Sequence, residues 1–197
     1  MHKRDFLAGA ALAGLLPAAA PAMAATTVSA PAGPVLLTVG GAVSPGNRGA
    51  LDKVRDQMMG KHDLKFSRAT AFDAAALARL PATRFRVTLE YDNQLHELQG
   101  PLLTTVLEAA GADLNKPLRL GLRAVDGYNA DLTLAEVQEW RVIVATHMDG
   151  QPLALGGLGP QWAIYEADAL PAFRSKPVNE RFVHSPWGMY YIDVAVA

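Results

Sequence analysis

Strict alternation of apolar and polar residues predicts half-buried β-strands in this chain. Between Arg84 and Tyr91 the apolar residues Phe85, Val87 and Leu89 alternate with polar ones, and Tyr91 continues the apolar series. Leucines at positions 118, 120 and 122 repeat the same spacing. A period of two places successive side chains on opposite faces of a strand, so each stretch has one face for the core. An apolar run at 35–39, followed by two glycines, predicts an earlier strand.

The helical patterns are short and have recognisable start or end signals. An Ala/Leu stretch at 73–80 ends at Pro81, and a leucine-rich stretch begins at Pro101, which suits a first helical position, and ends before Gly111. Thr133 and Glu136 have the spacing of a capping box. Apolar residues at 51, 54 and 58 predict one more helix before Gly60. Strands mixed with short helices predict an α+β fold with mixed or antiparallel sheets.

The stretch 142–165 reads VIVATHMDGQPLALGGLGPQWAIY and predicts a hairpin followed by another strand. A β-branched run leads to Asp149-Gly150, a pair that tolerates the positive φ angles of a two-residue type I′ turn. A glycine-rich loop then ends at Pro160, and Trp162 to Tyr165 form the last strand of the segment.

The N-terminus has the features of an export signal. A basic head (His2-Lys3-Arg4) precedes an apolar stretch at 6–16 and an Ala-x-Ala site at 22–24, and the apolar stretch is too short to span a bilayer. We therefore expect a signal peptide at 1–24, a flexible lead-in at 25–34, a single domain at 35–197 and a periplasmic mature chain. The sequence Lys3 to Leu7 is similar to a twin-arginine signal with Lys in the first position, so both the general secretory and the twin-arginine routes stay open.

Composition excludes several classes of function. The 197 residues carry a formal net charge of −1, which gives no electrostatic footprint for nucleic acid, and no sustained basic run indicates a membrane surface. We expect no membrane insertion of the mature chain. The five histidines lack the spacing of zinc ligands, no Walker-type phosphate loop is present, and no nucleophile motif can be recognised around Ser185.

Three motifs together resemble the oxidoreductase molybdopterin-binding domain, which has the sulfite-oxidase fold. They are FD-x-x-x-L-x-x-LP at 72–81, GP-L-L-x-x-x-L-x-x-x-G at 100–111 and AT-x-x-DG-x-P-L … GP-x-W-x-x-Y at 145–165. The resemblance covers roughly residues 35 to 195 and implies that the last of these motifs lines the pterin side of a cofactor pocket.

The absence of cysteine changes what this resemblance implies. In the catalytic family a cysteine thiolate binds molybdenum, a soft ligand for a soft centre, whereas this chain has no cysteine and carries Val87 or Thr88 in the corresponding strand. Cysteine-free members of this fold include periplasmic pterin-binding proteins of the PruR type, which the chain resembles. That resemblance implies pterin as a ligand, no tightly bound cofactor, no metal, and as partner the periplasmic domain of a membrane-bound cyclic-di-GMP enzyme.

The resemblance also suggests the ligand-binding residues. A pterin presents neighbouring N–H and amino donors that a carboxylate can accept, and a flat face on which an aromatic ring can stack. The candidates are the carboxylates, the aromatic platforms and one histidine near the motifs: Glu90, Tyr128, Asp131, His147, Trp162, Tyr165 and Trp187. Trp162 is better explained as a core residue, Asp131 has the alternative of capping the following helix, and His147 fits a hydrogen-bonded pocket wall better than a general base.

Three functions follow as hypotheses. The first is a pterin-binding protein without redox chemistry that relays pterin availability to a membrane-bound signalling enzyme. The second is a molybdopterin-dependent oxidoreductase that lacks the usual cysteine ligand. The third is a purely structural partner domain.

Overall fold

The computed structural model describes residues 28–197. The expected signal peptide and the first residues of the expected lead-in lie outside the described residues. The end of the lead-in is fixed, because the backbone N–H groups of Ala32 and Gly33 both donate to Asp73 Oδ2 at 3.0 Å.

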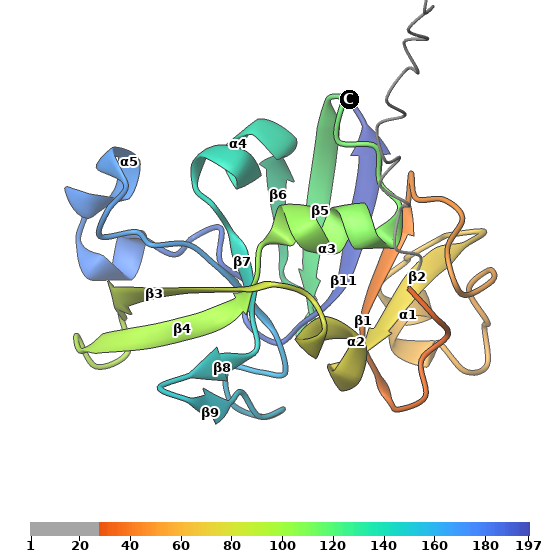
Figure 1. Ribbon diagram of the computed structural model, residues 1–197, viewed down its shortest axis with the longest axis horizontal. Helices are drawn as coiled ribbons and strands as arrows, with labels where there is room; N and C mark the ends of the chain where they lie inside the picture. The colour runs from red at the N-terminus through yellow and green to blue at the C-terminus, as the bar shows by residue number, and fades with distance from the viewer. Residues whose placement is uncertain (1–27) are drawn as a thin grey trace, which may run out of the picture.

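A five-stranded mixed sheet forms one half of the molecule, shown on the right of Figure 1. Its strand order is β2-β1-β11-β5-β6, and only the β1–β11 pair is parallel. Its strands are β1 Val35–Gly41, β2 Ala69–Asp73, β5 Leu118–Ala124, β6 Asn129–Thr133 and β11 Met189–Val196.

The other half contains a four-stranded antiparallel sheet of order β3-β4-β8-β9 and a two-stranded pair, β7 with β10. The strands are β3 Ala82–Thr88, β4 Leu95–Pro101, β7 Ile143–Ala145, β8 His147–Met148, β9 Gln151–Pro152 and β10 Trp162–Ile164. Strands β4 and β7 approach so closely that a Cβ on Gly100 would lie 1.9 Å from the Val144 carbonyl oxygen. Only glycine fits at this junction.

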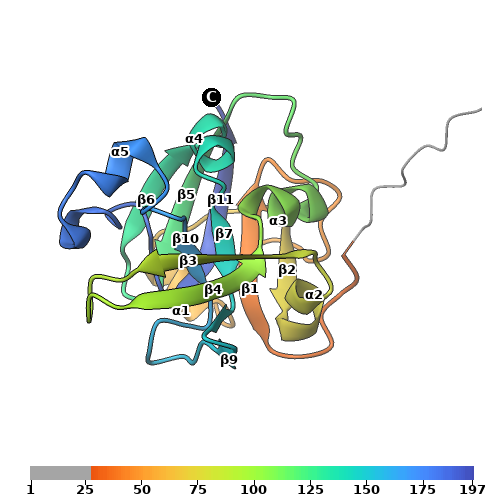
Figure 2. The same ribbon diagram turned by 60° about the vertical axis from the view of Figure 1, so that its left-hand side comes forward.

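The helices are short and connect these sheets. They are α1 Gln57–Lys61, α2 Ala74–Ala78, α3 Leu103–Ala110, α4 Leu134–Glu139, α5 Pro171–Arg174 and a 3-10 turn at Val178–Glu180. Helices α3 and α4 lie on one side of the β3–β4 ribbon, and β8 and β9 lie on the other (Figures 1 and 2). No helix within 28–197 combines the length and apolar character needed to cross a membrane.

One hydrophobic core joins the two halves. It includes Leu37 and Val39 of β1, Val106 of α3, Ile143 of β7 and Trp162 of β10, all at 0–1% exposure. A smaller cluster of Met59, Tyr190 and Tyr191 packs with partly buried residues of the segment between β1 and β2. That segment thus covers the face of the five-stranded sheet that points away from the main core.

Most predicted elements are confirmed, and the α+β class with mixed and antiparallel sheets and short helices is correct. Thr133 and Glu136 form a complete capping box. Gly111 caps α3 in the left-handed region with φ 89°. The Asp149-Gly150 turn has φ angles of 49° and 76°, as a type I′ hairpin requires.

Three predictions were wrong in detail. Helix α1 begins only at Gln57, Val54 is 79% exposed before it, and Gly60 lies inside the helix. Pro101 is the last residue of β4, and not the first of α3. Strand β3 ends at Thr88, so Tyr91 lies in a turn and is 55% exposed, because the chain must reverse there to pair β3 with β4.

His96 of β4 connects two turns through a pair of carboxylates. Its Nδ1 lies 2.6 Å from Asp149 Oδ2 in the β8–β9 hairpin, and its Nε2 lies 3.0 Å from Asp92 Oδ2 in the β3–β4 turn. The hydrogen bond to Asp149, followed by that to Asp92, raises the pKa of His96 above its ordinary value of 6.5. The bond to His96 likewise holds the pKa of Asp149 below its usual 3.8.

We expect this contact to make stability depend on pH. A raised histidine pKa adds stability that is complete below the unfolded value of about 6.5 and is lost as the pH rises through the folded value. The melting temperature of wild type should therefore exceed that of His96→Gln most clearly at pH 5–6, and the difference should shrink by pH 9. Thermal melts of both proteins across this range test the expectation, and a difference that is constant with pH would contradict it.

Candidate functional site

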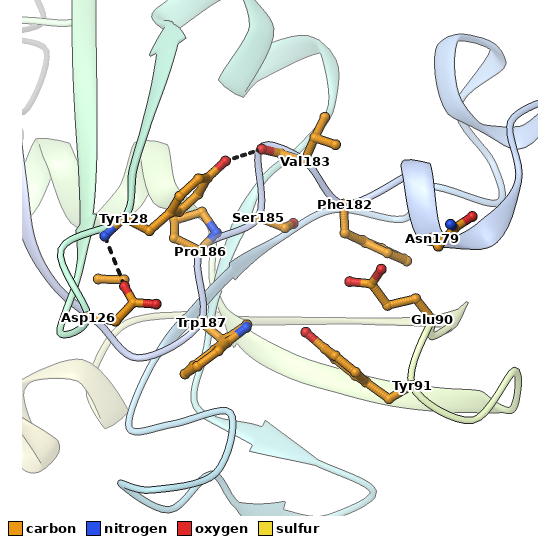
Figure 3. Close-up of a pocket in the computed structure, with 11 residues that line it drawn as sticks. Glu90, Tyr91, Asp126, Tyr128, Asn179, Phe182, Val183, Ser185, Pro186 and Trp187 are labelled. Atoms are coloured by element: carbon orange, nitrogen blue, oxygen red, sulfur yellow. Dashed lines mark hydrogen bonds between the residues drawn. The ribbon is translucent and has the colours of Figure 1, made fainter.

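Three separate chain segments enclose a cleft of about 320 Å³, here called the Glu90 cleft. The segments are the β3–β4 turn, the β5–β6 turn and the 179–187 stretch before β11 (Figure 3). The cleft is lined by Glu90, Tyr91, Ala124, Asp126, Tyr128, Asn179, Phe182, Val183, Ser185, Pro186 and Trp187.

Local hydrogen bonds shape the β5–β6 side of the cleft. Asp126 Oδ1 accepts from the backbone N–H of Tyr128 at 2.9 Å, and Gly127 between them has φ 93°. This turn directs the Tyr128 ring across the cleft, where its hydroxyl donates to the Val183 carbonyl (Figure 3). Tyr128 therefore ties the turn to the opposite wall.

A partly buried ion pair holds the β3 side against the 179–187 stretch. Asp168 Oδ2 accepts from the Thr88 backbone N–H at 2.7 Å, and its Oδ1 accepts from Arg181 Nη1 at 2.7 Å. The remaining Arg181 nitrogens donate to the carbonyls of Lys176 and Arg174. Since Glu90 follows Thr88 closely and Phe182 follows Arg181, this one carboxylate sets the distance between two walls of the cleft.

Glu90 and Tyr91 project from the β3–β4 turn toward Trp187 (Figure 3). Partial burial raises the pKa of Tyr91, and the neighbouring Glu90 carboxylate raises it further. The Tyr91 phenol therefore stays protonated at neutral pH and can donate a hydrogen bond.

Ser185 supplies an unused polar group in the wall of the cleft. It is 6% exposed, and its Oγ has no hydrogen-bond partner among residues 28–197. Trp162 Nε1 donates a hydrogen bond to the Ser185 backbone carbonyl at 2.9 Å. A buried hydroxyl without a partner is unfavourable unless a ligand or water completes its bonding.

The structure brings three of the seven sequence-predicted residues into this cleft: Glu90, Tyr128 and Trp187. Trp162 and Tyr165 lie beneath it at 1% and 0% exposure, so neither ring presents a face to a ligand. Tyr165 donates to the Arg181 carbonyl at 2.7 Å, and burial raises the pKa of its phenol. Both residues support the walls of the cleft.

The other two predicted residues lie elsewhere. Asp131 lines a groove of about 440 Å³ with Arg119 and Asp193, and it accepts from Asn129 Nδ2 at 2.9 Å. His147 lines a largely apolar cavity of about 210 Å³, where its Nδ1 lies 2.9 Å from Thr146 Oγ1. Residues of the stretch 146–161, the centre of the longest sequence motif, line this apolar cavity. No residue of that stretch lines the Glu90 cleft.

Sequence reasoning missed several lining residues. Tyr91 was assigned to the buried face of a strand, and Ser185 was considered only as a nucleophile. Asp126 could have been found from its position in the turn next to Tyr128. Phe182 and Asn179 carry no local signal, because their place depends on the Asp168–Arg181 pair.

The donor atoms of the cleft suit an organic ligand better than thiolate-bound molybdenum. They are carboxylate, phenol, amide, indole and hydroxyl groups, and the sequence has no cysteine. No group of three or more His, Asp or Glu side chains within 28–197 is arranged to hold a metal ion. The lining therefore does not fit a thiolate-bound molybdenum centre.

Comparison with known proteins shows a distant likeness in fold. No protein-family model and no curated protein matches the chain. Among solved structures, the chain is similar to the sulfane dehydrogenase SoxCD from Paracoccus pantotrophus, with a TM-score of 0.51 and 14% identity. The match covers 80% of this chain but only 37% of the SoxCD chain. At this identity the likeness establishes the sulfite-oxidase type of fold, as the sequence predicted, and nothing about activity.

We expect Asp168→Asn to loosen the cleft and destabilise the fold. Hydrogen bonds to charged groups contribute about 1.5–3 kcal/mol, which corresponds to a fall of about 3–12 °C in melting temperature for a domain of this size. Glu166→Gln is the matched control, since Glu166 lies two residues away and is exposed. Equal melting temperatures for the two variants would show that the Asp168 contacts contribute nothing measurable.

Proposed function

We propose that this protein binds a pterin in the Glu90 cleft and has no redox chemistry of its own. The observation that carries the proposal is the placement of one carboxylate, Glu90, among exposed aromatic side chains in a cleft of about 320 Å³. That volume is at the small end of the range for small-molecule sites. It suits a bicyclic ring better than a large cofactor.

The chemistry of the lining matches the pterin ring. Glu90 can accept hydrogen bonds from the adjacent N–H and amino groups of one ring edge, and charge-assisted bonds of this kind are strong. Tyr91, Tyr128 and Trp187 offer aromatic faces for stacking. The Ser185 hydroxyl, which has no partner among the described residues, offers one further polar contact in the wall.

A relay role is the finer part of the proposal. Four large side chains at the rim are well exposed: Tyr91 at 55%, Tyr128 and Val183 at 48%, and Trp187 at 38%. Exposed apolar side chains grouped around a ligand site are typical of a surface that meets another protein. A bound pterin would change that surface, and by resemblance to PruR-type proteins the partner is the periplasmic domain of a membrane-bound cyclic-di-GMP enzyme.

The first test is calorimetry with a tetrahydropterin. Glu90→Gln should weaken binding about 10- to 100-fold, because it removes the charge from the hydrogen bonds. Glu139→Gln, an exposed carboxylate at the end of α4, should bind as wild type does. No binding by wild type would refute the proposed ligand, while equal binding by Glu90→Gln would remove only the role of Glu90.

The likeness to a sulfane dehydrogenase favours one alternative, an oxidoreductase that uses molybdopterin without a cysteine ligand. Elemental analysis of protein purified from its native compartment separates the two functions. We expect molybdenum far below one equivalent per chain. One equivalent, together with sulfur-compound oxidation by the same protein, would establish the oxidoreductase instead.

A further inference from the structure

The Glu90 cleft contains negative charge at two ends and no positive charge. Glu90 lies on the β3–β4 side and Asp126 on the β5–β6 side, with Phe182, Ser185 and Pro186 between them (Figure 3). No Lys, Arg or His side chain of residues 28–197 lines the cleft.

Two arginines adjacent in sequence to lining residues, Arg123 and Arg181, form hydrogen bonds elsewhere. Arg181 is bound to Asp168 and to two backbone carbonyls. Arg123 donates to the Gly127 carbonyl and lines the separate groove that contains Asp131. Neither group forms an ion pair with Glu90 or Asp126.

We propose that this cleft admits neutral or cationic ligands and rejects anionic ones, and that Asp126 sets the selection. The proposal rests on the pterin function argued above and narrows it to pterins without a carboxylate or phosphate tail. A cleft with one sign of charge concentrates its field between low-dielectric walls and repels ligands of the same sign. The aromatic residues around it add to the attraction of cationic groups and of N–H donors.

The two carboxylates have different tasks because of where they lie. Glu90 is partly buried and faces the aromatic rings that would hold the ligand's ring system. Asp126 is exposed at the opposite end, where a substituent leaving the cleft would pass. Asp126 thus acts on the side chain of the ligand, and Glu90 acts on its ring.

Matched ligands separate charge from size. The probes are a tetrahydropterin with a neutral dihydroxypropyl side chain, one with a para-aminobenzoyl-glutamate side chain, and the dimethyl ester of the latter. At low ionic strength we expect the free glutamate form to bind at least about tenfold more weakly than its ester. The difference should shrink in 0.5 M salt, because exposed charges are screened.

Variants then test the role of Asp126 in the selection. Asp126→Asn keeps the oxygen that accepts from the Tyr128 N–H and removes the charge, so the difference between acid and ester should narrow to about threefold or less. Asp131→Asn removes an exposed carboxylate outside the cleft and should leave the difference unchanged.

Each result decides a different point. Equal affinity for acid and ester, or tighter binding of the acid, overturns the selection while the pterin function stands. If wild type binds the dihydroxypropyl compound but neither of the two larger ligands, the cleft selects by size, and this result also overturns the proposal. An unchanged difference in Asp126→Asn overturns the role of that residue. Failure of all three ligands to bind wild type overturns the pterin function itself.

Discussion

The geometry of the cleft depends on one carboxylate, that of Asp168. It accepts hydrogen bonds from the backbone at Thr88 and from the guanidinium of Arg181, and so joins the end of β3 to a stretch almost a hundred residues later. Glu90 and Phe182 each follow one of these anchor points. Without this contact the end of β3 and the segment at Arg181 would lose their direct hydrogen-bonded connection, and the distance from Glu90 to the opposite wall would be less closely fixed.

Aromatic packing beneath the cleft supplies the rigid base for that contact. Tyr165 packs against Phe173 and Trp140 with ring centroids 4.7 and 5.2 Å apart, and Trp140 meets Phe173 edge to face at 4.9 Å. Such pairs favour defined relative orientations of the rings. The helix α5 and the chain on either side of Asp168 are therefore held against the core.

Local sequence signals predicted most of the fold, and long-range contacts explain what they missed. The capping box at Thr133, the left-handed cap at Gly111 and the Asp149-Gly150 turn each depend on a few neighbouring residues, and each is found where the sequence placed it. Pro101 reads as a helix start on local grounds, yet pairing with β3 extends the strand through it.

The site was only partly predictable for the same reason. Glu90, Tyr128 and Trp187 were chosen as polar or aromatic residues close to recognisable motifs, and they do share a cleft. Trp162 and Tyr165 belong to a motif of equal clarity, but their size and their hydrogen bonds to backbone carbonyls fit them to the core. Sequence alone does not show which aromatic residue of a segment is buried, because that depends on the sheet that covers it.

The tight junction between β4 and β7 restricts how this protein can respond to a ligand. One core runs through both halves, and within one of them Gly100 lies directly against the Val144 carbonyl, so neither the halves nor these two strands can slide past each other without opening close-packed structure. Closure of two lobes around a ligand, the usual response of hinged binding proteins, is therefore not open to this fold. A partner protein can therefore detect a bound molecule only through the side chains and turns at the mouth of the cleft. Any receptor for the ligand-bound state has to contact that mouth directly.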